Sequence, residues 1–217
     1  MYTPFDVSTW KRRSAYAFFK AYDNPFYNIC THLEVGPLHS WCKQEGLSFH
    51  LTMMHYAAAV VNDFMEFKLR IKDGSVVLCS EVDCGSTVLS KDEVFSFCYF
   101  KWNSDLRQFV ANAEQVMEAH FESERFDPRS DALNLIYFSA IPWVSFTSIS
   151  HAKRFNSQES IPLITFGKYF AENGQLKLPI SIEVNHALVD GYHVGQYLTK
   201  LQANLLENRP EAGKLWV

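Results

Sequence analysis

Helical and strand-like patterns alternate along the whole of this sequence. Apolar residues recur about every 3.6 positions in some segments, and short runs rich in β-branched and aromatic residues lie between those segments. Lys72-Asp73-Gly74-Ser75 separates two apolar runs and predicts a hairpin turn. Strands interspersed with helices predict an α/β fold, an α+β two-layer sandwich in which helices cover mainly one face of a mixed sheet. The predicted helices are Ser8–Ala21, Leu51–Phe67, a segment capped by Ser104 that runs through Phe121, and Gly191–Leu206; the predicted strands are Phe26–Val35, Leu69–Ile71, Val76–Leu78, Val94–Tyr99, Leu133–Ile149, Leu163–Phe170 and Leu176–Val184.

The composition is that of one folded domain. The 217 residues are 47% hydrophobic and 15% aromatic, and Gly (9) and Pro (8) are scarce, which excludes disordered and collagen-like chains. A chain of this length buries roughly 70% of its unfolded surface, so we expect a single domain over residues 1–217. The net charge of -4 argues against a broad nucleic-acid-binding surface, but is compatible with one small basic patch.

Neither membrane insertion nor secretion is predicted. No apolar run approaches the roughly 20 residues of a membrane-spanning helix, and the segment Met1–Asp6 lacks the basic and apolar regions of a signal peptide. The cysteines number five, and the nearest pair, Cys79 and Cys84, has no second pair with which to hold zinc. The sequence therefore predicts a soluble, cytoplasmic protein with reduced and mostly buried thiols.

The most informative stretch is Val184-Asn185-His186-Ala187-Leu188-Val189-Asp190-Gly191-Tyr192-His193. A strand-like run leads into His186, and Asp190-Gly191 then turns the chain into a helix, so the histidine can face a cleft. A neutral imidazole can take a proton from a hydroxyl near pH 7, and such a general base contributes about 10²–10⁴-fold in rate. Asp190 would fix the loop through hydrogen bonds or an ion pair, and Gly191 would permit a backbone angle that other residues resist.

Two other interpretations of this motif stay open. Short motifs have many false positives, so His186 could be a buried, hydrogen-bonded histidine beside a helix-capping aspartate. His186, Asp190 and His193 could also be metal ligands, but His193 is seven residues away and the helix past Gly191 can turn it elsewhere. We therefore predict no metal site.

Hydroxyl groups near a strand end could serve acyl transfer. In Pro142-Trp143-Val144-Ser145-Phe146-Thr147-Ser148, strand alternation would put Ser145 and Thr147 on one face, with Ser148 displaced by a turn. They could equally be ordinary strand hydroxyls bonded to the backbone. The sequence contains no G-x-S-x-G, G-x-G-x-x-G or Walker pattern, so neither a nucleophilic serine nor a phosphate-binding loop is expected.

Several blocks together resemble a known family, the chloramphenicol acetyltransferases that use acetyl-coenzyme A. The blocks occur in family order over nearly the whole chain. Alone, the H-x-x-x-D-G element recurs in other coenzyme A-dependent acyltransferases and identifies only that superfamily. The blocks are Tyr2-Thr3-Pro4-Phe5-Asp6-Val7 with Trp10-Lys11-Arg12-Arg13, Arg70-Ile71-Lys72-Asp73-Gly74, Pro142 to Ser148, Thr165-Phe166-Gly167-Lys168-Tyr169, and His186 to Val194.

The resemblance implies a homotrimer with active sites at subunit interfaces. By motif, His186 would deprotonate the acceptor hydroxyl, which would attack acetyl-coenzyme A directly, and Ser148 would stabilise the oxyanion, worth about 10²–10³-fold in rate. Thr165 would help through ordered water, and an Arg12–Asp190 pair would hold the loop of the histidine. Acetyl-coenzyme A would be a co-substrate, with no tightly bound cofactor.

The resemblance also implies binding residues. Lys168 and Tyr169 match residues near coenzyme A, and the antibiotic pocket would be lined by Phe18, Phe19, Asp23, Pro25 and Tyr27. The chain departs from the family pattern at several positions: Asn185 replaces a histidine, Ser48 or a neighbour replaces a basic residue near the coenzyme phosphate, Asp23 is unexpected in an apolar pocket, and Lys153-Arg154 adds charge.

Three functional hypotheses follow from these residues. The first is O-acetylation of chloramphenicol. The second is the same chemistry on another small polar alcohol or amine, which Asp23 and the Lys153-Arg154 pair favour. The third is a non-catalytic trimeric binding protein, against which the retained His186, Ser148 and Asp190 argue.

Overall fold

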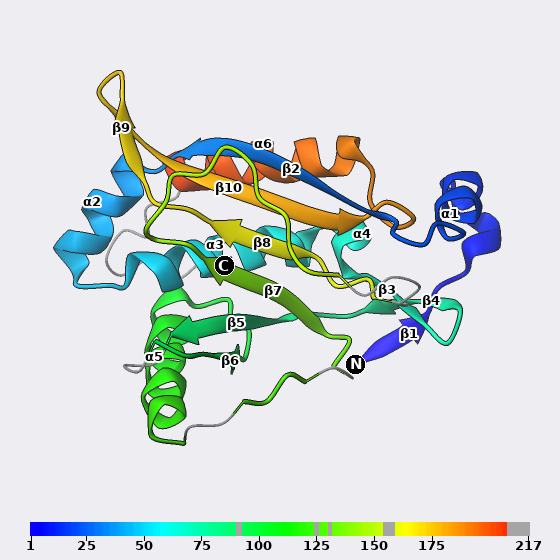
Figure 1. The fold of residues 1–217 in the computed structure, drawn as a ribbon, viewed down its shortest axis with the longest axis horizontal. Helices are drawn as coiled ribbons and strands as arrows, with labels where there is room; N and C mark the ends of the chain where they lie inside the picture. Colours follow the sequence, from blue (N-terminus) through cyan, green and yellow to red (C-terminus); the bar gives the residue numbers. More distant parts are fainter. Residues whose placement is uncertain (90–92, 124–125, 130–131, 154–158, 208–217) are drawn as a thin grey trace.

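A seven-stranded mixed sheet organises the molecule (Figure 1). The computed structural model describes residues 1–89, 93–123, 126–129, 132–153 and 159–207. The strand order is β2-β10-β8-β7-β5-β6, and β9 pairs with the first residues of β10. Strand β7 runs parallel to β5 and β8, whereas the other pairs are antiparallel. The strands are β2 (Phe26–Glu34), β5 (Asp83–Leu89), β6 (Phe95–Phe100), β7 (Leu135–Ala140), β8 (Leu163–Phe166), β9 (Phe170–Glu172) and β10 (Gln175–Asn185).

A small second sheet joins the N-terminus to the middle of the chain. Its order is β1 (Tyr2–Pro4), β4 (Ser75–Cys79) and β3 (Leu69–Lys72). The predicted hairpin between β3 and β4 is confirmed. Its turn residues Asp73 and Gly74 both have positive φ, 49° and 75°, as the turn type that matches strand twist requires.

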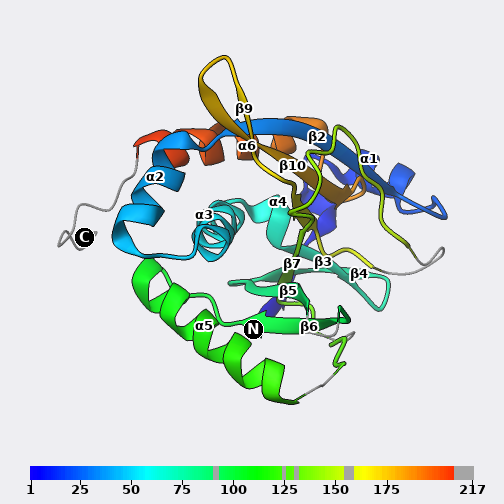
Figure 2. The same ribbon diagram turned by 60° about the vertical axis from the view of Figure 1, so that its left-hand side comes forward.

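Helices cover one face of the large sheet, as predicted. Figure 2 shows α3 (Phe49–Asp63) against the sheet, with α2 (Gly36–Glu45), α6 (Gly191–Glu207) and α5 (Leu106–Ser123) around it. Most of α3 is buried, because it packs against α2, α5, α6 and strands β5 and β7. No helix in the described ranges is both long and apolar enough to cross a membrane.

The opposite, outer face of the sheet is covered by a loop rather than by helices. Residues 141–153, which follow β7, cross this face: the Lys168 N–H donates to the Val144 carbonyl at 2.9 Å, and Lys153 Nζ lies 2.7 Å from Glu183 Oε1 on β10. The segment is not a strand, so the predicted strand Leu133–Ile149 ends instead at Ala140. The chain turns at Pro142, and the expected alternation of Ser145 and Thr147 on a strand face is wrong.

Other predicted boundaries also shift, for local reasons. The first helix is shorter than Ser8–Ala21, since a 3-10 turn at Val7–Thr9, capped by Asp6, precedes α1 (Arg13–Phe19). Extended backbone at Phe64 separates α3 from α4 (Met65–Lys68).

The cap of α5 and the end of β8 also differ from the prediction. Asp105 rather than Ser104 caps α5, because the Asp105 carboxylate accepts from the Gln108 N–H at 2.9 Å. The predicted strand Leu163–Phe170 breaks at Gly167, where an added Cβ would lie 3.0 Å from Phe146 and Pro179 side-chain atoms. The final helix is confirmed, while its predicted terminator, Asn208 to Pro210, lies outside the described residues.

Candidate active site

His186 lies where β10 leaves the sheet. Asn185, the last residue of β10, pairs with Phe26 of β2, and the His186 N–H donates to the Pro25 carbonyl at 2.8 Å. The imidazole stacks on the ring of Phe19, with centroids 3.8 Å apart and planes 9° from parallel. Its side chain is 32% exposed, so this histidine is neither core nor fully solvated.

Of the two imidazole nitrogens, Nε2 is the one available to a substrate. His186 Nδ1 is buried and has no hydrogen-bond partner among the described residues. It lies 3.4 Å from Asp190 Oδ1, longer than an ordinary hydrogen bond but close enough for the carboxylate to favour a proton on Nδ1. That tautomer leaves the Nε2 lone pair free to accept a proton.

Arg12 holds the loop that carries His186. Its guanidinium donates to Asp190 through Nε (2.6 Å to Oδ2) and through a second, short contact to Oδ1. It also donates to the carbonyls of His186 (3.0 Å), Ala187 (3.1 Å) and Leu188 (2.6 Å). Burial opposes the charged form of Asp190, but the hydrogen bonds and charge of Arg12 outweigh it and lower the pKa of that carboxyl. The structure thus brings Arg12 and Asp190 together as expected.

His193 does not join His186 around a common centre. His193 Nδ1 accepts from the Asp190 N–H at 3.0 Å, and its Nε2 points at Glu66, 3.6 Å away. Burial lowers the pKa of His193, which suits this accepting role. No group of three potential ligands in the described part of the chain could hold a metal ion. The expectation for Gly191 is wrong, since its φ is not positive and an added Cβ would meet nothing within 4 Å.

Asn185, a departure from the family pattern, has a structural use. Its side chain is buried, its Oδ1 accepts from the Ala187 N–H at 2.9 Å, and its Nδ2 donates to the Glu159 carbonyl at 3.2 Å. The Asn185 side chain therefore hydrogen-bonds backbone groups on either side of the loop, one of them in the turn after His186. These hydrogen bonds do not involve the imidazole.

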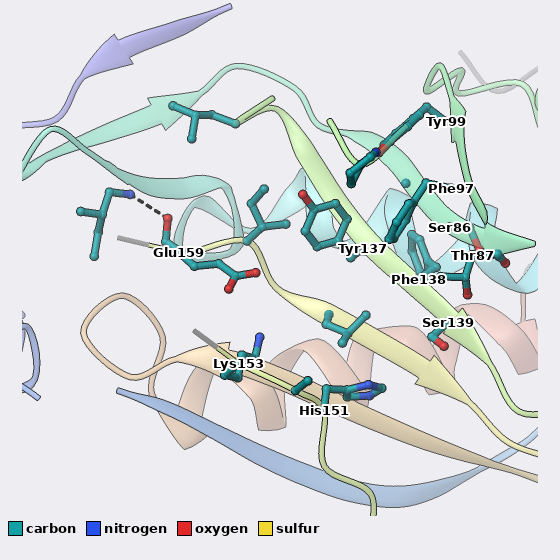
Figure 3. Close-up of a pocket in the computed structure, with 18 of the residues that line it drawn as sticks. Ser86, Thr87, Phe97, Tyr99, Tyr137, Phe138, Ser139, His151, Lys153 and Glu159 are labelled. Carbon is teal, nitrogen blue, oxygen red and sulfur yellow. Dashed lines mark hydrogen bonds between the residues drawn. The ribbon is translucent and has the colours of Figure 1, made fainter. Parts of the chain in front are cut away.

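A cavity of about 1050 Å³ opens on the outer face of the sheet. Its wall has two parts, which Figure 3 shows on opposite sides. Aromatic rings of Phe97, Tyr99 and Tyr137 form one side, and His151 and Lys153 from the crossing loop lie on the other. Such a cavity suits a ligand that has one apolar and one polar end.

Thr165 and Ser139 lie side by side at the polar end. They are opposite each other across the parallel pair β7–β8, so their side chains share a face. Ser139 lines the cavity, and the fully buried Thr165 has its Oγ1 3.0 Å from His151 Nε2.

Ser148 has a different environment from Ser139. It is exposed on the crossing loop and does not line this cavity. Its neighbour Ser145 donates its hydroxyl to the Lys168 carbonyl at 2.8 Å, one of the backbone bonds that the sequence left open as an alternative. Sequence reasoning missed Ser139, although strand alternation with buried Ile136 and Phe138 could have placed it on the outer face.

The two groups of candidate residues do not meet within one chain. Thr165 is opposite Ser181 on β10, and His186 lies five positions farther along, about 16 Å at the rise of a strand. The candidate base and the hydroxyls next to the cavity are therefore separate sites of a single protomer.

The residues matched to the coenzyme lie just beyond the C-terminal end of β8. Lys168 and Tyr169 are exposed, and the Tyr169 ring packs near His39 (5.0 Å) and Phe49 (6.1 Å) at the start of α3. Ser48, which stands near the position of the expected basic residue, caps α3 by accepting from the Leu51 N–H at 3.4 Å.

The five residues matched to the antibiotic pocket surround the His186 loop instead of the cavity. Phe19, Pro25 and Tyr27 contact His186 directly through ring stacking, a carbonyl and a second ring 4.5 Å away. Phe18 and Asp23 are exposed to solvent, and none of these five described residues lines the cavity.

Comparison with solved structures first defines the fold class. The chain superposes on a dihydrolipoamide acetyltransferase of Azotobacter vinelandii with a TM-score of 0.68, 14% identity and coverage of 90% of this chain and 86% of that one. At this identity the match shows the shared fold alone. A solved chloramphenicol acetyltransferase matches with a TM-score of 0.87 and 29% identity, over 94% of this chain and all of the other.

Sequence comparison gives the family. The chloramphenicol acetyltransferase family model matches residues 1–202. Chloramphenicol acetyltransferase 3 of Escherichia coli is 31% identical over 93% of this chain and 95% of its own, and a chloramphenicol acetyltransferase of Klebsiella sp is 30% identical over 93% and 92%. The chain belongs to the chloramphenicol acetyltransferase family.

Proposed function

We propose that this protein transfers the acetyl group of acetyl-coenzyme A to a hydroxyl of chloramphenicol. The observation that carries the proposal is the His186 loop: a partly exposed imidazole, a carboxylate 3.4 Å from Nδ1, and an arginine that binds both the carboxylate and the loop carbonyls. Family membership and the relatives' printed activity support the same chemistry.

The reaction needs no acyl-enzyme. His186 Nε2 takes the proton of the acceptor hydroxyl as its oxygen attacks the thioester carbonyl, and the C–S bond breaks as the tetrahedral species collapses. The released coenzyme thiolate takes the proton back from the imidazolium, so the histidine ends neutral. Asp190 stabilises the transient positive charge and holds the ring in position.

An oxyanion donor completes the site, and two serines are candidates. Ser148 is the one that the motif match assigned, but it is exposed and outside the cavity. Ser139 lines the cavity beside Thr165, where a substrate carbonyl can be enclosed. We therefore propose Ser139 as the donor and keep Ser148 as the alternative, with Thr165 acting on ordered water.

The complete site is proposed to form between two copies of the chain in a homotrimer. The separation of about 16 Å between His186 and the hydroxyls supports this, because one protomer cannot bring them to the same carbonyl. Lys168 and Tyr169 are proposed to contact the coenzyme. Sedimentation should give three times 25.0 kDa, and a monomer would contradict the shared site.

A second acceptor class is favoured by one observation. Lys153 lines the cavity and pairs with Glu183 at 2.7 Å, both side chains being about nine-tenths buried. A buried ion pair costs desolvation, so its place in the cavity wall suits a small polar alcohol or amine. Arg154, the other charge noted in the sequence, lies outside the described residues.

A cytoplasmic location also stays a prediction, with which five unpaired cysteines are compatible.

Thiol release from acetyl-coenzyme A in the presence of chloramphenicol tests the proposal. The natural protein should release thiol rapidly, and His186→Ala should reduce kcat by about 10²–10⁴-fold because the base is lost. Ser139→Ala should lower kcat by about 10²–10³-fold, and the matched variant Ser148→Ala should lower kcat by less than about threefold. The reverse order would return the oxyanion role to Ser148.

The outcome without chloramphenicol turnover is also informative. Thiol release with other alcohols or amines would identify the second acceptor class. Coenzyme binding with no release for any acceptor would leave the non-catalytic trimeric binding protein as the function.

A further inference from the structure

His151 is a second histidine at the cavity that no motif singles out. It lies on the loop that crosses the outer face of the sheet, its side chain lines the cavity, and its Nε2 is 3.0 Å from Thr165 Oγ1. Figure 3 shows the imidazole on the same side of the cavity as Lys153, with Ser139 nearby.

The partner of His151 is a hydroxyl with a choice of hydrogen bonds. The Thr165 side chain can donate one hydrogen and accept through two lone pairs. It is fully buried and lies opposite Ser139, the proposed oxyanion donor. Whatever fixes the direction of the Thr165 hydrogen therefore decides whether this oxygen donates or accepts in its other hydrogen bonds beside Ser139.

We propose that His151 is a positioning residue for acetyl transfer, whose neutral imidazole accepts the Thr165 hydroxyl hydrogen and leaves that oxygen to accept a second hydrogen bond. A protonated His151 would donate to Thr165 instead and reverse the arrangement. The inference rests on the proposed function and adds a second ionisation to it.

The groups around His151 keep it neutral near pH 7. Burial lowers the pKa of His151, the Glu183 carboxylate on β10 raises it, and the Lys153 ammonium on the same loop lowers it, with a net decrease. Glu159, from the segment before β8, lines the same cavity, while the neighbouring positions of β7 and β8 carry hydroxyl groups. The neutral, accepting form is therefore the form present at the working pH of a histidine base.

The pH dependence of kcat/KM tests this role. In the natural protein both histidines must be neutral, so log kcat/KM should fall with a limiting slope of about two on the acid side. His151→Gln can still bond Thr165 but cannot titrate, so the slope should fall to one. His151→Phe removes the bond and should lower kcat about tenfold with little change in KM for coenzyme, and His151→Gln should restore most of that loss.

The matched control is His32→Gln, which removes an exposed histidine of β2 that lies outside the cavity. It should keep the slope of two. The ¹⁵N shift of His151 Nε2 gives a readout that is independent of turnover, and Thr165→Val should move it towards the value of an unbonded imidazole.

The outcomes separate the two proposals. Normal turnover with an unchanged slope in His151→Gln, or a ¹⁵N shift that ignores Thr165→Val, would overturn the role of His151 alone. Absence of acetyl transfer to any acceptor would overturn the proposed function and the role of His151 together.

Discussion

Arg12 and Arg70 each bind several backbone carbonyls, in two regions of the molecule and with different consequences. Arg12 lies before α1, its side chain is 11% exposed, and it binds three loop carbonyls and the carboxylate of Asp190. Arg70 on β3 is fully buried. In the described part of the chain its hydrogen-bond partners are four backbone carbonyls: Phe67 (2.8 Å), Leu69 (2.7 Å), Leu133 (2.9 Å) and Leu135 (2.6 Å).

The difference separates a structural clamp from a functional one. Arg70 joins β3 to the start of β7, and burial lowers its pKa to about 10. Arg12 joins the N-terminal segment to the loop that carries the proposed base, and its counter-ion also faces His186. Removing Arg70 should therefore affect folding, whereas removing Arg12 should affect catalysis more than folding.

Arg70→Met should have the largest effect on stability. Methionine keeps much of the side-chain length but leaves buried carbonyls without donors, at a cost of about 4 kcal/mol. For a domain of this size that loss should lower Tm by about 12 °C in thermal unfolding followed by circular dichroism. The control Lys200→Met removes an exposed ion pair with Asp63 and should change stability by less than about 0.5 kcal/mol. An Arg70→Met variant as stable as the control would end the distinction between the two clamps.

His55 extends the comparison to a buried histidine, in which burial disfavours the charged form of the side chain. Its Nε2 donates to the Asn103 carbonyl at 3.1 Å, its Nδ1 has no partner among the described residues, and burial lowers its pKa to about 4. The unfolded chain binds this proton below about pH 6.5, so stability should fall as the pH drops from 6.5 towards 4. Between pH 7.5 and 5 the loss due to His55 should be about 2 kcal/mol in urea unfolding.

His55→Gln is the control for that measurement, since other groups also titrate in this range. The pH-dependent loss should be about 2 kcal/mol smaller in His55→Gln than in the natural protein. Equal pH dependence in both proteins would mean that His55 accepts its proton in the folded state.

Arg12→Met should have the smallest effect on stability of the three, about 1–2 kcal/mol, because Asp190 is 34% exposed and water can solvate its carboxylate once the guanidinium is removed. Its kcat should nevertheless fall about 10–100-fold, since the loop is no longer held and Asp190 loses its partner. A double-mutant cycle with Asp190→Asn, measured on kcat/KM, should show a coupling of about 1–3 kcal/mol. Additive losses would mean that the pair does not act as a unit.

Local patterns predicted much of this molecule. The hairpin at Asp73-Gly74, the final helix and a sheet with helices on one face follow from turn chemistry and periodicity, which act over a few residues. Helix α2 was not predicted, although Pro37 lies in its first turn, where proline fits a helix. Strand β5 was missed because Cys84, Gly85 and Ser86 carry no strand signal of their own and pair with β6 and β7 through tertiary contacts.

The sequence and the family resemblance it carries therefore predicted which residues surround His186, and the structure brings Arg12 and Asp190 to that loop. The expectation for Gly191 did not hold, because its backbone angle is one that any residue can adopt. Only the tertiary structure decided which hydroxyl lies at the cavity, because Ser139 and Ser148 differ in which face and which loop they occupy, not in residue type. The contact of His151 with Thr165, and the distance that separates both from His186, likewise depend on strand register, which sequence spacing does not encode.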